Sequence, residues 1–145
     1  MRVEQYSEKY HEDLILLVDK FSTEYVSLFD PDYSKLSVED TISKFPKELI
    51  FLLVDGGQAV GVIAGISVPN RYNTKKLYEE ILWYVEPNHG KYAFWFVEQV
   101  EKKVKAMGFS GLIMSVLNSP KGEKIKRIYE KIGYQYLESH YIKNL

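Results

Sequence analysis

The stretch from Ile81 to Gly108 constrains the fold most, because a strand, a tight turn and a long amphipathic helix follow one another directly. The apolar strand ends at Pro87, and Asn88–Lys91 forms the turn. A short apolar run at 111–116 follows the helix, which predicts a β–α–β unit. The turn amides and the positive end of the helix dipole could together bind an anion such as a phosphate.

A tight hairpin precedes this unit. Leu49–Val54 and Ala59–Val68 are apolar runs joined by Asp55–Gln58, whose two glycines supply the positive φ that a hairpin turn requires. Gly61 and Gly65 lie on one face of the second strand, which indicates either a β-bulge or a closely packed helix. The other expected elements are a strand at 2–6, helices from Ser7 and Ser37, a strand at 76–85, a basic helix ending near Ile132 and a closing strand at 134–145.

These elements follow in the order β-α-α-β-β-β-α-β-α-β within a single domain that spans residues 1–145. The order predicts a mixed α/β fold, in which a central, mostly antiparallel sheet carries helices on both faces. In the closing strand we expect packing from Tyr134, Tyr136, Ile142 and Leu145.

Composition narrows the classes of function. The chain of 145 residues contains no cysteine, which excludes disulfides, thiolate metal ligands and a cysteine nucleophile. Its histidines, His11, His89 and His140, lack the spacing of metal ligands, so no metal is expected. The start lacks the apolar segment of a signal peptide, and no apolar run is long enough to cross a bilayer. We therefore expect a cytoplasmic protein without a membrane partner.

Charge is divided unevenly along the chain. Residues 1–55 carry twelve acidic and six basic side chains, whereas residues 56–145 carry eight and thirteen. A basic half that also contains the turn suits a small polyanionic ligand, although two solvated surfaces would explain the same charges. Nucleic acid is not an expected partner, because the basic helix has too few aromatic side chains interleaved with its charges.

Three stretches, in this order, resemble the GNAT superfamily of acyl-CoA-dependent N-acetyltransferases. The hairpin at 53–63 is similar to that family's hairpin, in which a glycine follows a short apolar run. Trp83–Pro87 with His89–Lys91 resembles the strand and glycine-rich turn before its central helix. The run at 128–134, IYEKIGY, matches the family's LYEKxGF segment closely. The resemblance covers nearly the whole chain.

The resemblance implies an enzyme of the transferase class, an acyltransferase that moves an acetyl group from acetyl-CoA to a primary amine. Direct attack of the amine on the thioester is the implied route, because no nucleophile suited to a covalent intermediate is indicated. Acetyl-CoA would act as a co-substrate without a metal. The sequence does not identify the amine acceptor, which could be a small molecule or a protein.

The turn departs from the family pattern. His89 stands in the place of the usual Arg or Gln, Tyr92 replaces a glycine, and the run is one residue short. Glycines let the backbone approach a pyrophosphate closely, so a shortened, glycine-poor turn makes that approach harder. The alternative hypothesis is therefore a GNAT-fold binding or interaction protein with weak or no catalysis.

Under the enzyme hypothesis, amides near Gly90–Ala93 hold the CoA pyrophosphate with help from His89 and Lys91. An ordinary strand-to-helix loop is the alternative interpretation. The expected cofactor-binding residues are Tyr84, Val85, His89, Gly90, Lys91, Tyr92, Ala93 and Asn118.

Tyr129 is the leading catalytic candidate, because the resemblance implies that the tyrosine of the YEKxG run protonates the departing thiolate. A core tyrosine that only packs its ring is the alternative. Glu79 and Glu80 are the candidates for a general base, and either could instead be an exposed charge at a strand end. Side chains alternate along a strand, so only one of the two can face the cleft, and the sequence leaves this choice open.

Acceptor recognition in relatives comes from the loop between the first two helices and the loop before the fourth strand. Acidic side chains beside aromatic rings would suit a cationic amine, although Asp beside proline is also common in turns. The expected acceptor-binding residues are Phe29, Asp30, Asp32, Tyr33 and Tyr72. Phe94 and Trp95 lie outside the core stripe of the central helix, so they either widen the buried face or mark the contact of a homodimer.

Overall fold

The computed structural model describes residues 1–28, 30 and 38–145 of the chain. The chain forms two compact units, Met1–Met114 and Ser115–Leu145. The first unit contains the sheet, and the second contains helix α4 (Gly122–Lys131) and the C-terminal segment. The expectation of a single domain stays a prediction.

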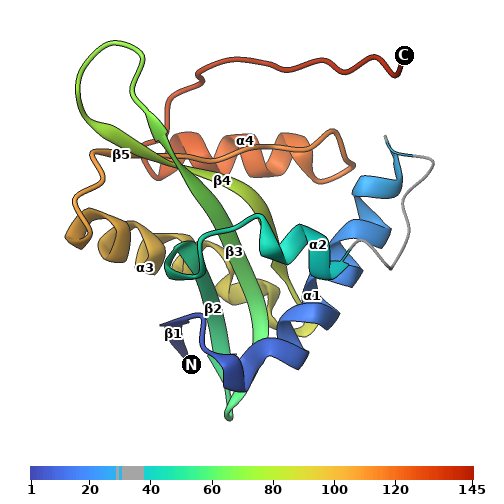
Figure 1. Cartoon of the computed structure of the whole chain (residues 1–145). Coiled ribbons are helices and arrows are strands. Elements are labelled where there is room, and N and C mark those ends of the chain that lie inside the picture. The colour runs from blue at the N-terminus through green and yellow to red at the C-terminus, as the bar shows by residue number, and fades with distance from the viewer. Residues whose placement is uncertain (29, 31–37) are drawn as a thin grey trace. The chain divides into compact units, whose positions relative to one another are not determined.

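A five-stranded sheet in the order β1-β2-β3-β4-β5 forms the centre of the first unit (Figure 1). Strands β1 to β4 pair as antiparallel neighbours, whereas β5 is parallel to β4. The predicted hairpin and the predicted β–α–β unit are therefore confirmed, and Gly56 and Gly57 turn the hairpin with φ values of 56° and 82°. The strands are β1 (Arg2–Gln5), β2 (Ile50–Asp55), β3 (Gln58–Pro69), β4 (Lys76–Val85) and β5 (Gly111–Ile113).

Helices α1 and α2 lie between β1 and β2 in the chain, and α3 connects β4 to β5. The helices predicted from Ser7 and Lys91 each begin with a 3₁₀ segment. Among the described residues, no helix is long and apolar enough to span a membrane. The bounds in the first unit are η1 (Glu8–Tyr10), α1 (His11–Glu24), η2 (Val26–Leu28), α2 (Val38–Ser43), η4 (Lys47–Leu49), η5 (Pro87–Tyr92) and α3 (Ala93–Ala106).

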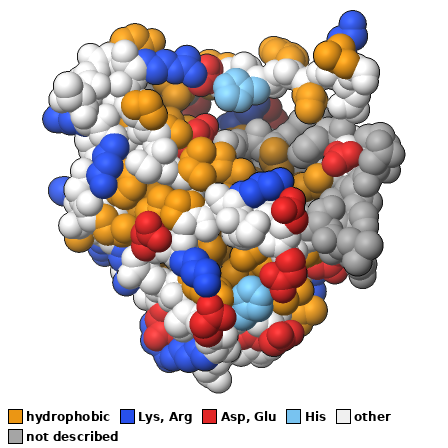
Figure 2. All heavy atoms as spheres, in the orientation of Figure 1, with side chains coloured by type: hydrophobic (Ala, Val, Ile, Leu, Met, Phe, Trp, Pro, Cys, Tyr) orange, Lys and Arg blue, Asp and Glu red, His pale blue; other side chains and the backbone are white. Residues whose placement is uncertain are grey.

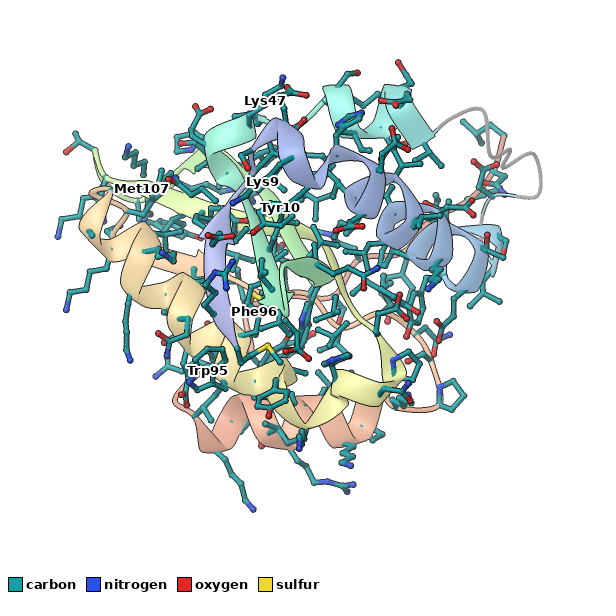
Figure 3. The ribbon with its side chains drawn as sticks, turned by 90° about the horizontal axis from the view of Figure 1, so that it is seen from below. Lys9, Tyr10, Lys47, Trp95, Phe96 and Met107 are labelled. Carbon is teal, nitrogen blue, oxygen red and sulfur yellow. The ribbon has the colours of Figure 1, made fainter. Side chains whose placement is uncertain are left out.

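The larger core lies between the sheet and helices α1 and α2. Apolar side chains on one face of α1 are buried and pack against residues of β2 and β3. Figure 3 shows α1 and α3 on opposite sides of the sheet, which confirms the prediction of helices on both faces. The core members on α1 are Leu14, Leu17, Val18 and Phe21, and those on β2 and β3 are Ile50, Leu52, Val54, Ala59, Val62 and Ala64.

Helix α3 covers the other face of the sheet. Its side chains Phe96, Val97 and Val100 have no exposed surface. Figure 3 shows Phe96 on the side of α3 that faces the sheet and Trp95 on the outer side. The strand residues that alternate with those of the larger core, such as Phe51, point toward this second face.

A buried tyrosine completes this second face at the start of β4. The ring centre of Tyr78 lies 6.0 Å from the ring centres of both Phe51 and Phe109. Its hydroxyl donates to the Leu49 carbonyl at 2.9 Å. Burial raises the pKa of the Tyr78 phenol, and the nearby charge of Glu80 adds to this, so the hydroxyl stays a donor at neutral pH.

A β-bulge interrupts the pairing of β3 with β4. Ala64 pairs with Leu82 and Gly65 with Glu80, so Ile81 is an extra residue on β4. Glu80 and Leu82 therefore point to opposite faces of the sheet, although residues two positions apart in a strand normally point to the same face. Of the two explanations predicted for the glycines, the bulge is confirmed.

The predicted closing strand at 134–145 is wrong, because the structure has no strand there. Tyr136 and Ile142, expected to pack, are 75% and 70% exposed, and Leu145 is exposed as well. The apolar alternation breaks at Leu137, which directly follows Tyr136, so no single face of a strand would be apolar. Of the four residues expected to pack, Tyr134 alone is partly buried.

The strand predicted at 111–116 is also shorter than expected. It covers Gly111–Ile113, and its residues are half-buried rather than buried. Because β4 is its sole neighbour in the sheet, β5 has ladder hydrogen bonds on one side only.

We expect Gly65→Ala to destabilise the protein by about 2–3 kcal/mol. An added Cβ would overlap the Glu79 carbonyl oxygen and lie 2.5 Å from a carbon of the Tyr78 ring. Urea unfolding measures the loss. Gly90→Ala is the matched control, because a Cβ there meets nothing within 4 Å. Equal stability of the two variants would contradict the tight contact at the bulge.

Candidate active site

Strands β4 and β5 pair at one end and separate at the other. The pairs run from Leu77–Gly111 to Glu79–Ile113, whereas β4 continues to Val85. Over the described residues, β3 is therefore the sole sheet partner of the segment Glu80–Val85, which we call the open edge. Alternate N–H and C=O groups of such an edge point away from the partner strand and can bind an extended ligand.

The bulge separates the two candidate bases. Glu80 lies opposite Gly65 on the face covered by α3 and is 4% exposed. Glu79 lies opposite Ile66, is half-buried, and faces the side that carries α1 and α2. Of the two, Glu79 points toward the α1 side, and which of them faces the cleft stays a prediction.

The turn after β4 is a closed 3₁₀ helix. The His89 N–H donates to the Glu86 carbonyl at 2.8 Å, and the Ala93 N–H donates to the Gly90 carbonyl. Each N–H of a 3₁₀ helix bonds the carbonyl three residues earlier, so both ends of this run are internally bonded. These bonds occupy the N–H groups of His89 and Ala93, and the binding of a pyrophosphate near Gly90–Ala93 stays a prediction. With fewer glycines than the family pattern, the backbone continues in helical geometry.

His89 connects this turn to the β2–β3 hairpin. Its Nε2 lies 3.0 Å from Oδ2 of Asp55. A carboxylate only accepts, so Nε2 carries the proton, while Nδ1 is closed to solvent and makes no hydrogen bond. His89 therefore positions the turn, and its Nε2–H is directed at the Asp55 carboxylate rather than at a ligand phosphate.

Lys91 is the exposed cation of the turn. Its ammonium lies 5.1 Å from the ring centre of Tyr92, and that ring contacts Trp95 at 6.4 Å between centres. An ammonium at this place can attract a phosphate as a point charge.

Two contacts fix helix α1 to the strands next to the site. Asp13 accepts the Ala59 N–H at 2.9 Å. Lys20 forms an ion pair with Glu86, the residue before η5, and the hydrogen bond with Glu86 raises the pKa of Lys20. The end of α1 is thus connected directly to the turn.

Tyr25 and Tyr84 are neighbouring phenols near the end of α1. Burial, helped by Glu24, raises the pKa of Tyr25 to about 12. Burial, with the charges of Glu86 and Glu24, also raises the pKa of Tyr84. Tyr84 is buried and Glu86 is paired with Lys20, so Tyr25 and Glu24 are the groups here that could meet an organic ammonium ion.

Three of the predicted acceptor-binding residues, Phe29, Asp32 and Tyr33, lie outside the described residues. The Asp30 N–H donates to the Val26 carbonyl at 2.9 Å. Tyr72 lies in the loop between β3 and β4 and is 92% exposed. Asp30 and Tyr72 stay predictions.

Tyr129 and Asn118 belong to the second unit. Tyr129 lies on α4, is 6% exposed, and donates its hydroxyl proton to the Ser115 carbonyl at 3.3 Å. Its ring centre is 5.2 Å from that of Tyr134. Asn118 is exposed in the segment before α4. Glu79, Tyr84, Val85 and the turn residues 89–93 belong to the first unit.

The open edge and the turn differ in how well they would suit the two ends of a CoA thioester. The open edge can accept an extended, amide-bearing arm, because an edge strand pairs with such chains. In the turn the N–H groups of His89 and Ala93 are already bonded, so Lys91 is the feature that could attract the pyrophosphate. Throughout the part of the chain that is described, no group of three or more His, Asp or Glu side chains could hold a metal ion.

No protein-family model matches the sequence, and no curated protein matches it. Solved structures match over nearly the whole chain. A ribosomal-protein-alanine N-acetyltransferase from Brucella melitensis biovar Abortus 2308 has a TM-score of 0.75 and 14% identity, over 99% of this chain and 98% of that chain. An aminoglycoside acetyltransferase from an uncultured soil metagenomic sample has a TM-score of 0.72 and 15% identity, over 99% and 97%.

A transcriptional regulator from Bacillus halodurans C-125 has a TM-score of 0.74 and 12% identity, over 99% of both chains. At these identities the likeness establishes the fold. The chain has the mixed α/β fold of the GNAT acetyltransferases, as the resemblance predicted.

Two features of this site were missed from the sequence. The bulge residue Ile81 gives no signal of its own, because apolar residues are common in strands. The pair Lys20–Glu86 joins residues that are 66 positions apart, and nothing in the chain marks them as partners.

We expect Tyr25→Phe to reduce the loss of stability at high pH. The unfolded chain loses this phenol proton near pH 10, whereas the folded protein keeps it to about 12. The free energy of unfolding therefore falls as pH rises through this window, by at most about 1.4 kcal/mol per pH unit from this group. Urea unfolding from about pH 8 to about pH 11 measures the slope. Exposed Tyr72→Phe is the control, and equal slopes in both variants would contradict the expectation.

Proposed function

We propose that this protein is an N-acetyltransferase that moves an acetyl group from acetyl-CoA to a primary amine. The open edge Glu80–Val85 carries the proposal, because it offers backbone groups to an extended acyl donor at the place where two strands of the GNAT fold diverge. The similar structures described as acetyltransferases support the same class of reaction. The proposed location is the cytoplasm.

The donor would lie along the open edge, with Tyr84 and Val85 beside its arm. Its phosphates would be attracted by Lys91 and by Asn118 rather than by the closed amides of η5. The pyrophosphate would then be held mainly by charge, so donor binding should weaken at high salt.

The amine nitrogen attacks the thioester carbonyl carbon, and the carbon–sulfur bond breaks as the new amide bond forms. The departing thiolate takes a proton, which we assign to the Tyr129 hydroxyl. The attacking amine loses a proton, which we assign to Glu79 acting directly or through water, because Glu79 faces the α1 side and is half-buried. Glu80, buried on the other face, would instead support the bulge.

The acceptor would approach from the side of α1 and α2. Tyr25, with Glu24 nearby, favours a positively charged amine. Asp30 and Tyr72 are proposed as further contacts, together with Phe29, Asp32 and Tyr33. Trp95, exposed on the outer side of α3, is proposed as a contact of a homodimer.

The second candidate is a binding protein that retains the fold without catalysis. The closed η5 helix favours it, because a phosphate cradle would require the hydrogen bonds at His89 and Ala93 to open. The two candidates differ first in whether acetyl-CoA binds.

Calorimetric titration with acetyl-CoA tests the donor site. We expect a micromolar dissociation constant, about −8 kcal/mol, and a weakening of about fivefold to tenfold in Lys91→Ala. Lys102→Ala, which removes the same charge from an exposed position on α3, is the control and should bind as the unmodified protein does. No heat at millimolar acetyl-CoA would refute the enzyme and favour the binding protein.

We expect Tyr129→Phe to lower turnover by about 100-fold while the affinity for acetyl-CoA stays unchanged, because only proton donation is lost. The change removes one oxygen and keeps the ring packing against Tyr134. Thiol release measured with a small-amine panel, with binding measured in parallel, checks this. Turnover equal to that of the unmodified protein would remove Tyr129 from the mechanism.

A further inference from the structure

A cavity of about 210 Å³ lies away from the open edge, near the opposite side of the sheet. Tyr6, directly after edge strand β1, and Ile50, the first residue of β2, contribute to its lining. Strand β3 separates β2 from β4 in the sheet, so this cavity is distinct from the acyl-donor site. It lies on the side that carries α1 and α2. Figure 2 shows hydrophobic side chains mixed with acidic and basic ones on this side of the molecule.

Three titratable side chains of the lining form one hydrogen-bonded chain. His11 Nε2 lies 3.0 Å from Oε1 of Glu39, and His11 Nδ1 lies 2.9 Å from the Tyr6 hydroxyl. Because a carboxylate only accepts, Nε2 carries a proton, and the Tyr6 hydroxyl, which has one proton, bonds both His11 Nδ1 and the Glu8 carboxylate. Burial raises the pKa of the Tyr6 phenol, with Glu8 adding to this, so Tyr6 keeps that proton.

This chain leaves acceptor atoms toward the cavity. The Tyr6 oxygen has lone pairs, and the carboxylate of Glu39, which His11 contacts through Oε1, has a second oxygen that can accept. Ser43 donates its hydroxyl proton to the Asp40 carbonyl at 2.6 Å, so its oxygen also presents lone pairs.

The ammonium of the lining, on Lys47, is engaged elsewhere. It lies 3.0 Å from Oε1 of Glu8 and 5.4 Å from the ring centre of Tyr6. Figure 3 labels Lys47 at η4, on the α2 side of the sheet. A ligand of the cavity thus meets oxygen acceptors and an ammonium that already has its counter-ion, which disfavours an anion.

The rest of the lining is apolar. Ile42 from α2, Phe45 and Ile50 provide hydrocarbon and an aromatic ring. The volume is below the ~300–1,000 Å³ of pockets for drug-sized ligands. The cavity therefore suits a ligand with one small ring or a short branched chain.

We propose that this cavity binds a small organic ammonium ion, whose charged head bonds Glu39, Tyr6 and Ser43 and whose apolar body packs against Ile42, Phe45 and Ile50. An ammonium has donors and no acceptor, which complements the oxygens, and its charge is opposite to that of Glu39. This second site is separate from the proposed acetyltransferase reaction and needs no acetyl donor.

Titration of the full chain with benzylammonium chloride, followed by NMR of isoleucine and leucine methyl groups, tests the proposal. We expect the signals of Ile42 and Ile50 to shift with a millimolar dissociation constant, while Leu82 on β4 stays in place. Glu39→Gln keeps the shape and removes the charge, and it should weaken binding by about tenfold. Glu98→Gln, the same change at an exposed position on α3, should leave the affinity unchanged.

Two further probes separate charge from shape. Benzyl alcohol keeps the ring and a hydroxyl donor without the charge, so we expect it to bind about tenfold more weakly. Sodium benzoate reverses the charge, so it should not shift the signals of Ile42 or Ile50. Equal binding of benzoate, equal affinity in Glu39→Gln, or shifts confined to Leu82 would overturn the proposal. Because no acetyl-CoA is added and the readout is local, failure of the acetyltransferase hypothesis would not change these outcomes.

Discussion

The extra residue at Ile81 is the constraint on which the first unit depends. Without it, Glu79 and Tyr84 would point to opposite faces of β4, because their positions differ by an odd number. With it, both face α1, where an acceptor can approach, while Tyr78 and Glu80 remain on the side of α3. The bulge requires Gly65, since any larger residue would meet the Glu79 carbonyl. This insertion in the β3–β4 ladder thus decides which side chains of β4 share a face.

In the turn, the same backbone N–H groups can serve two purposes that exclude each other. A row of N–H groups can bind a phosphate, or it can close 3₁₀ hydrogen bonds. Glycines favour the first outcome, because they allow conformations that keep the amides outward. This chain has Tyr92 in place of one glycine, and its backbone closes. Each hydrogen bond is worth about 1 kcal/mol net, so a bound pyrophosphate would have to compensate for those it opens.

Strong local patterns made most of the fold predictable. The Gly-Gly hairpin and the apolar stripes of the first and central helices follow from turn chemistry and helical spacing, and they were confirmed. The glycines of β3 indicated a bulge; beside Gly61 the extra residue is Val60 on β3, whereas beside Gly65 it is Ile81 on β4, where the sequence gives no signal. The tail at 134–145 failed because strand propensity without a partner does not form a ladder. The hydrogen bonds that join Tyr6, His11 and Glu39 could not be predicted from the sequence, because Glu39 lies 28 residues beyond His11.

Helix α1 is a rod of fourteen residues, roughly 21 Å long, that is held at Asp13 by the start of β3 and at Lys20 by the end of β4. A rod fixed at two points can neither slide along the sheet nor pivot without breaking one contact. Helix α1 therefore links His11, its first residue, to the turn after Glu86. A change in the position of α1 at one of these contacts would therefore require the other contact to move or break.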